Sequence, residues 1–145
     1  KNAELLFTAA QTGVRETRHI KGEHVLTGEE YLNAVHFEDA VSRGAHPIDI
    51  HTAGDTTQKC QFLKNAAYIP YRSLIVPGFD NLLVAGRCFS ADQVASASVR
   101  VQASVMGLGQ AAGCAAAQCA CAGTSVHKAD VPTLQAMLRK WGALI

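Results

Sequence analysis

The chain of 145 residues has no excess of charge of either sign and no run of like charges. Its 13 Lys and Arg residues against 12 Asp and Glu give a formal net charge of +1, so nothing indicates nucleic acid or an anionic membrane surface as a partner. Low-complexity tracts and internal repeats are also missing. With 48% hydrophobic and 17% charged residues, the composition is that of a single globular domain and not of a disordered segment.

A hydrophobic run suited to a membrane is missing too. The most apolar stretch, residues 105–117, is broken by Gln110 and flanked by Arg100, Gln102 and Gln118. It is too short and its side chains are too small to span a bilayer. We therefore expect no membrane partner and favour a cytoplasmic location, although the compartment stays open.

The sequence has neither an initial Met nor a signal-like segment. A segment typical of a strand, Ala3–Phe7, lies at its very start. We expect a fragment of a larger protein, with a removed targeting segment as the other possibility.

No CxxC pair occurs, and the number of cysteines is odd: Cys60, Cys88, Cys114, Cys119 and Cys121. These spacings fit neither a disulfide framework nor a zinc site, so we predict no metal centre. The favoured interpretation is that the thiols are small buried hydrophobic groups in a reducing compartment. Cys88, beside Arg87, is the one candidate for a reactive thiol.

Residues 81–123 organise the predicted fold. The apolar run Asn81–Ala85 shows no alternation and ends in Gly86 and Arg87, which predicts a central strand buried on both faces, as in a parallel sheet. A polar turn then leads to an Ala/Gly-rich segment, residues 96–122, predicted as one long buried helix. The fold class is therefore α/β, with a ligand expected near the junction of strand and helix.

The ligand site is expected at the start of this helix. The first amides of a helix lack intrahelical partners and its dipole favours an electron-rich acceptor, so we predict donors near Ser98, Val99 and Arg100. Gly86 would let a ligand approach the backbone closely. The string Gly107–Ala112 matches the dinucleotide fingerprint GxGxx(G/A), but it lies inside the predicted helix instead of in a strand–helix turn, so we reject it as a nucleotide site.

The presence of Gly107, Gly109 and Gly113 in this helix needs an explanation, because each glycine lowers helix stability by about 1 kcal/mol relative to Ala. We interpret them as the place where another backbone packs closely on this face. The remaining expected elements are strands over residues 5–10, 13–20, 23–26, 47–51 and 68–76, a short helix capped by Thr27, a helical turn over 37–42, a loop over 53–58, and a packing helix over 130–141.

Several segments together resemble, in order and spacing, the FAD-dependent oxidoreductases of the glutathione-reductase-like flavoprotein superfamily. These segments are GVRETR at 13–18, AHPIDIH at 45–51, IPYRSLI at 69–75, DNLLVAGRC at 80–88, SVRV at 98–101 and GQAAG at 109–113. The resemblance implies that residues 1–145 form the carboxyl-terminal part of an FAD/NAD(P)-binding-like fold. The amino-terminal GxGxxG unit, which holds the adenosine half of FAD, is absent from this sequence.

By this resemblance, FAD is the cofactor and an unidentified small organic substrate supplies a hydride. Gly86 and Arg87 would lie along the ribityl–pyrophosphate path. The helix start, Ser98 to Val101, would face the pyrimidine carbonyl of the flavin, where negative charge develops on reduction. The fragment alone is expected to be inactive, and its main partner would be the missing amino-terminal part of the same enzyme.

The catalytic candidates are Arg72 and Arg15, which with Arg18 are suited to contacts near the flavin ring or an anionic substrate. The alternative is that they form structural salt bridges, for example with Glu16 or Asp49. His46 and His51 are candidates for a base, although ordinary surface histidines are favoured. The resemblance departs at Gln93, where family members often have His, and this puts acid–base chemistry in doubt.

Two other functions stay open from the sequence. One is a non-catalytic α/β domain that associates through the Ala/Gly-rich helix. The other is an NAD-binding half-domain, which the lack of a strand–GxGxxG–helix unit disfavours.

Overall fold

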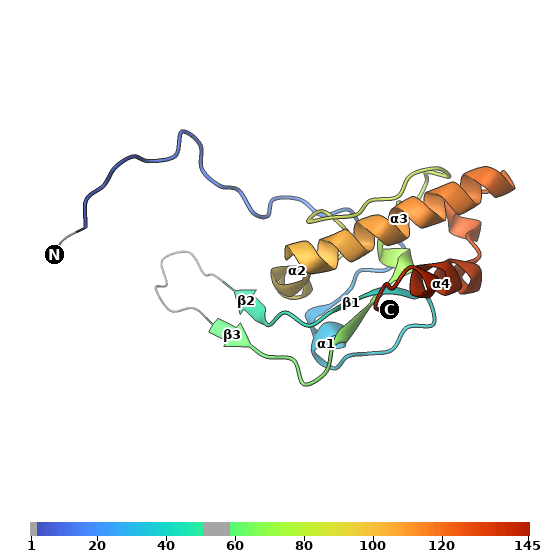
Figure 1. The fold of residues 1–145 in the computed structure, drawn as a ribbon, viewed down its shortest axis with the longest axis horizontal. Helices are drawn as coiled ribbons and strands as arrows, with labels where there is room; N and C mark the ends of the chain where they lie inside the picture. The colour runs from blue at the N-terminus through green and yellow to red at the C-terminus, as the bar shows by residue number, and fades with distance from the viewer. Residues whose placement is uncertain (1–2, 51–58) are drawn as a thin grey trace.

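The computed structural model describes residues 3–50 and 59–145 and shows a mixed α/β arrangement (Figure 1). The predicted loop at 53–58 and the candidate base His51 lie outside the described residues. The elements in chain order are α1 Gly28–Leu32, β1 Ala40–Gly44, β2 Ile48–Ile50, β3 Lys59–Gln61, β4 Ala67–Pro70, the 3₁₀ turn η1 Tyr71–Ser73, α2 Gln93–Val99, α3 Gln102–Ala122, the 3₁₀ turn η2 Val126–Lys128 and α4 Val131–Lys140.

The sheets are small. β1 pairs antiparallel with β4, and β2 pairs antiparallel with β3, so each sheet in the described part of the chain has two strands. The helix α3 packs against β1 on one side and against α4 on another. The fully buried side chains between these elements include Leu26, Tyr31, Ile69, Leu74, Phe89, Val99, Leu108 and Leu134.

The prediction of a buried central strand at residues 81–87 is wrong for this structure. Leu83 forms one isolated antiparallel bridge with Ile75, and the amide of Val84 donates to the carbonyl of Leu74 at 2.8 Å. Leu82 is 38% exposed. An apolar run without alternation indicates burial on both faces, but Leu83, Val84 and Ala85 are only half-buried.

The predicted single helix over 96–122 is two helices, α2 and α3. The helix α2 begins earlier than expected, because the carboxylate of Asp92 caps it by accepting a hydrogen bond from the amide of Ala95 at 2.7 Å. The chain then leaves the helical conformation at Val101, whose φ of −70° and ψ of 151° are extended, before α3 starts. Gly123, with a left-handed φ of 62°, ends α3.

The helix α3 is longer than the apolar stretch in the sequence indicated. It has 21 residues, and an 18-residue window within it has a mean hydropathy of 1.2, which is enough by length and composition alone to cross a membrane. This is weak evidence, because the core helix of a folded domain passes the same test.

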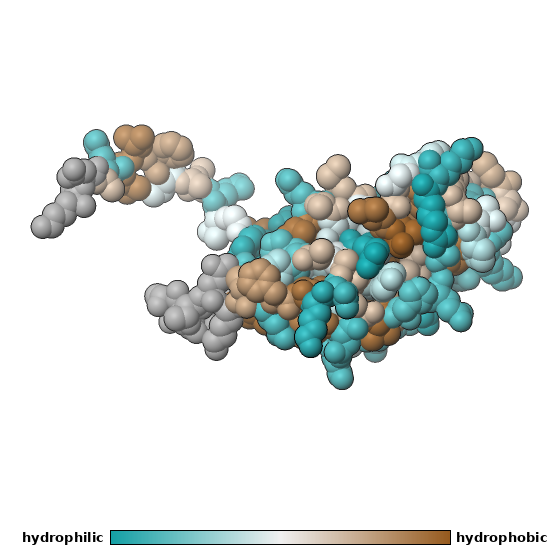
Figure 2. All heavy atoms as spheres, turned by 60° about the horizontal axis from the view of Figure 1, so that its bottom comes forward, coloured by the Kyte–Doolittle hydropathy of each residue, from teal (hydrophilic) through white to brown (hydrophobic). Residues whose placement is uncertain are grey.

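The strands predicted over residues 5–10 and 13–20 are not formed. Residues 3–18, called the arm from here on, have no regular structure, and the first part of the arm projects from the body (Figure 1). Leu5, Leu6 and Phe7 are 79–82% exposed, and Figure 2 shows apolar side chains uncovered on the arm. An alternating or apolar pattern forms a strand only beside a partner, and the arm has none among the described residues.

The other predictions are confirmed in part. The segment 23–26 forms a single parallel bridge, between Leu26 and Ala91. Of the helical turn expected at 37–42, only a turn at 38–39 is present, and β1 begins at Ala40. The strand at 47–51 is present as β2, and the strand at 68–76 is β4 followed by η1. The last helix is confirmed as α4, although Trp141 is its C-cap and is 60% exposed.

Candidate functional site

Arg15, Arg87 and Arg100 meet at the start of α3. Together with Val101, Gln102 and Val105 they line a cavity of about 410 Å³. The arm, the end of the 81–87 run and the α2–α3 junction each contribute one of the three guanidinium groups. Segments that are far apart in the sequence thus build one cationic cavity.

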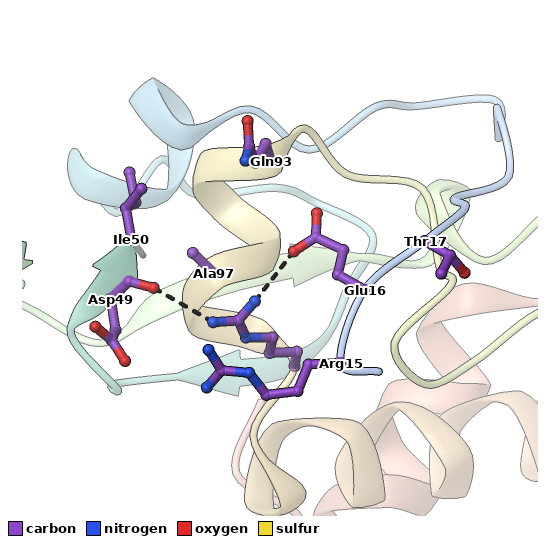
Figure 3. Close-up of a pocket in the computed structure, with 8 residues that line it drawn as sticks. Arg15, Glu16, Thr17, Asp49, Ile50, Gln93 and Ala97 are labelled. Carbon is purple, nitrogen blue, oxygen red and sulfur yellow. Dashed lines mark hydrogen bonds and ion pairs between the residues drawn. The ribbon is translucent and has the colours of Figure 1, made fainter. Parts of the chain in front are cut away.

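Arg100 holds two of these segments together. Its side chain is 14% exposed, and its Nη1 donates to Glu16 Oε2 at 3.1 Å. Its Nη2 donates to the carbonyl of Asp49, the middle residue of β2, at 3.4 Å (Figure 3). A guanidinium that is largely removed from water needs such partners, so Arg100 fixes the arm and β2 against α2.

Arg87 fixes the arm at a second point. It follows Gly86, whose φ of 99° suits glycine and makes the chain turn sharply after the 81–87 run. Its Nη1 donates to the carbonyls of Val14 and Arg15, at 2.9 and 3.3 Å. The side chain of Arg15 itself makes no hydrogen bond or ion pair within residues 3–50 and 59–145, so its charge stays available to a ligand.

The start of α3 adds further positive potential. Val101 occupies the N-cap position with an aliphatic side chain, so it cannot accept from the amides of Gln102, Ala103 and Ser104. The first turn carries no acidic residue. The partial positive charge of the helix end is therefore directed at the same cavity as the arginines, which suits an anion or an electron-rich carbonyl.

Ser98 and Val99, two of the predicted cofactor contacts, lie elsewhere. Both are inside α2, where helical bonding uses their amides, and the amide of Arg100 donates to the carbonyl of Ser96 at 3.1 Å. Val99 is fully buried in the core. The hydroxyl of Ser98 is buried and hydrogen-bonds to the hydroxyl of Tyr31 and the carbonyl of His46. The prediction of free donors at 98–100 is thus wrong, because the break in the helix moves them to the start of α3.

Arg72 is held in a structural ion pair. Its Nε donates to Asp39 Oδ2 at 3.0 Å and its Nη2 donates to Asp39 Oδ1 at 3.2 Å, and these hydrogen bonds to the carboxylate raise the pKa of Arg72. Arg72 does not line the cavity at the start of α3. Of the two catalytic candidates, the structure therefore brings Arg15 to the cavity and gives Arg72 a partner, Asp39, that the sequence did not single out.

An adjoining cavity of about 380 Å³ shares Arg15 and Arg100 with the first (Figure 3). One face of α2 forms its wall, since Gln93, Ala97 and Arg100 follow each other at helical spacing. The opposite side comes from the arm and from β2, through Arg15, Glu16, Thr17, Asp49 and Ile50. Gln93, which stands where the resembling family often has His, therefore lies in the site region. Sequence reasoning did not assign Thr17 or Gln102 to the site.

The comparison with known protein families identifies the family of the chain. Residues 1–138 match the family described as FAD dependent oxidoreductase. Neither the curated proteins nor the solved structures gave a match. Three arginines around an uncapped helix start suit a cofactor with phosphates and electron-rich ring carbonyls. The chain therefore belongs to the FAD-dependent oxidoreductase family, and FAD is its cofactor.

Proposed function

We propose that this chain supplies the flavin-ring side of the FAD site in an oxidoreductase that removes a hydride from a small organic substrate. The observation that carries the proposal is the convergence of Arg15, Arg87 and Arg100 on the uncapped start of α3. When bound, FAD supplies a redox-active ring that accepts the hydride. The contribution of the chain is a fixed positive potential beside it.

The residues divide this work between them. The amides of Gln102 and Ala103 would donate to an electron-rich edge of the ring, because they have no acceptor in the helix. Arg87 would offset phosphate charge, and Arg15, which lines both cavities, would lie between the cofactor and the substrate. Arg100 would act as a positioning residue, since Glu16 and the carbonyl of Asp49 already occupy its guanidinium.

The proposal includes the amino-terminal part of the enzyme as the partner of this chain. The exposed apolar side chains of Leu5, Leu6 and Phe7 and the incompletely paired 81–87 run support it, because such segments are stable in a sheet with further strands. The adenosine half of FAD would be held there. The chain alone is then expected to bind the cofactor weakly and to catalyse nothing.

Amide chemical shifts measured by NMR test the proposal even when binding is weak. FAD, FMN and ADP are titrated separately into the chain at millimolar concentration. We expect FAD and FMN to shift the amides of Gln102, Ala103 and Ser104, while ADP leaves them in place. Arg87→Gln should weaken the response, and Arg139→Gln, an exposed arginine in the last turn of α4, should not. Shifts with ADP but not FMN would assign the site to the nucleotide half and refute the proposal.

A second candidate is association through α3, without catalysis. Only 28% of its most apolar window is buried, and a Cβ added at Gly109 or Gly113 would meet no atom within 4 Å. Small residues on an open helix face allow another backbone to approach closely. Sedimentation analysis of the wild type and of Gly113→Leu distinguishes this candidate, which requires an oligomer that the substitution disrupts.

A further inference from the structure

A third cavity, of about 460 Å³, lies beside the first and carries a strong positive charge. It shares Arg15 and Arg87 with the cavity at the start of α3 and adds Val14, Glu16, Thr17, Arg18 and Cys88. Neither Gln102 nor Val105 lines it. It is thus a separate compartment that borders the proposed cofactor site through two shared arginines.

The charge in this third cavity is not neutralised by the protein. Arginine stays protonated at all physiological pH values. In the described part of the chain, Arg15 and Arg18 have no hydrogen-bonding or ion-pair partner, and Arg87 donates to backbone carbonyls, which carry no net charge. The only carboxylate in the lining, that of Glu16, is shared between Arg100 and His19, each at 3.1 Å. At least two guanidinium groups therefore face the cavity without a counter-ion.

We infer that this cavity binds an anionic group, a carboxylate or a phosphate, of the organic substrate. The inference rests on the proposed function, since it places the substrate beside the flavin-ring side of the site. Guanidinium groups bind such planar or multidentate oxyanions through paired charge-assisted hydrogen bonds. Arg18 belongs to this cavity and not to the other two site cavities, so it is the residue that selects for an anionic substrate.

Cys88 provides a built-in probe, because its thiol is exposed and lies in the cavity lining. Alkylation by iodoacetate, an anion, is compared with alkylation by the neutral iodoacetamide, and each cysteine is read separately by mass spectrometry. The ratio of the two rates cancels the intrinsic reactivity of the thiol. Cys121, also exposed but located in α3 outside this cavity, is the internal control. We expect the ratio to be higher at Cys88 and to fall towards that of Cys121 in Arg18→Gln.

Protection by a model ligand completes the test. Succinate, but not neutral succinamide, should slow alkylation of Cys88 and leave Cys121 unaffected. Removing one charge-assisted contact costs a factor of about 10 in affinity, so Arg18→Gln should require about tenfold more succinate, and Arg139→Gln should behave as wild type. Equal rate ratios at the two cysteines, or no protection by succinate, would overturn the inference.

The source of the anion is distinguished by repeating the protection experiment with FAD. If the cavity serves the substrate, succinate still protects Cys88 when FAD is present at saturation. Displacement of succinate by FAD would show that the arginines bind the pyrophosphate of the cofactor, and the inference would fail while the proposed function stands. If FAD does not bind but succinate protects Cys88, the proposed function fails and the anion site remains.

Discussion

Asp92 joins two helices with a single carboxylate, and its removal should be unusually costly for a surface loop. Its Oδ1 accepts from the amide of Ala95 at 2.7 Å and caps α2, while its Oδ2 accepts from the amide of Gly28, the first residue of α1, at 2.8 Å. Loss of an N-cap costs about 1 kcal/mol, and leaving the buried Gly28 amide without an acceptor costs about 2 kcal/mol. Asp92→Ala should therefore lower the free energy of unfolding by about 3 kcal/mol.

The measurement is urea unfolding followed by far-ultraviolet circular dichroism. With a denaturant slope of about 2 kcal/mol per molar urea, the midpoint should fall by about 1.5 M. Asp92→Asn keeps one accepting oxygen, so its midpoint should lie between those of Asp92→Ala and the wild type. Asp130→Ala is the matched control, because Asp130 caps α4 alone. Equal midpoint shifts for Asp92→Ala and Asp130→Ala would show that the bond to Gly28 contributes nothing, and would refute the reasoning.

Three further predictions concern one ion pair, one packing contact and the exposure of the cysteines. The hydrogen bond that His127 donates to the Glu23 carboxylate raises the pKa of His127 above 6.5. The stability from this pair is therefore complete at lower pH and is lost as pH rises through the raised pKa, and urea midpoints of His127→Gln should lack this loss. Gly44→Ala would place a Cβ 2.2 Å from the hydroxyl of Tyr31, and this overpacking should cost about 2 kcal/mol in a thermal melt, with unchanged stability contradicting the packing. Thiol titration of the native chain should label three cysteines and reach five only in denaturant, since burial also raises the pKa of the two buried thiols; the expected native set is Cys60, Cys88 and Cys121.

Local signals were sufficient to predict the last helix and the strand around Ile48. Asp130 caps α4 from its own sequence neighbourhood, and Leu134 and Leu138 follow at helical spacing and are buried. Both features depend on residues within a few positions of one another. The arm and the 81–87 run are different, because their patterns describe contacts with strands that the described chain does not provide. The hydrophobic pattern of a segment indicates that it prefers to be buried. It does not indicate which other segment covers it.

The glycines of α3 also differ in whether the described chain supplies the contact that their presence predicts. At Gly107 an added Cβ would lie 2.5 Å from the hydroxyl oxygen of Ser42 on β1, so the helix packs closely there, although the contact is with a side chain and not with a backbone. Gly109 and Gly113 face open space, and their conformational cost has no compensation within the described residues. The sequence therefore predicted a close approach correctly at one position. At Gly109 and Gly113 the close approach of another backbone stays a prediction, which would require a partner outside the described residues.

The break between α2 and α3 decides where the site lies. A continuous helix over 96–122 would place Gln102 to Ser104 in its interior, with every amide bonded to a carbonyl four residues earlier. Neither Gly nor Pro marks the break, so it could not be predicted from the residue pattern. The extended backbone of Val101 creates a second helix start. That start falls beside Arg15 and Arg87. The positive potential of the site is thus produced by an interruption of the helix, and not by the carboxyl end of a central strand.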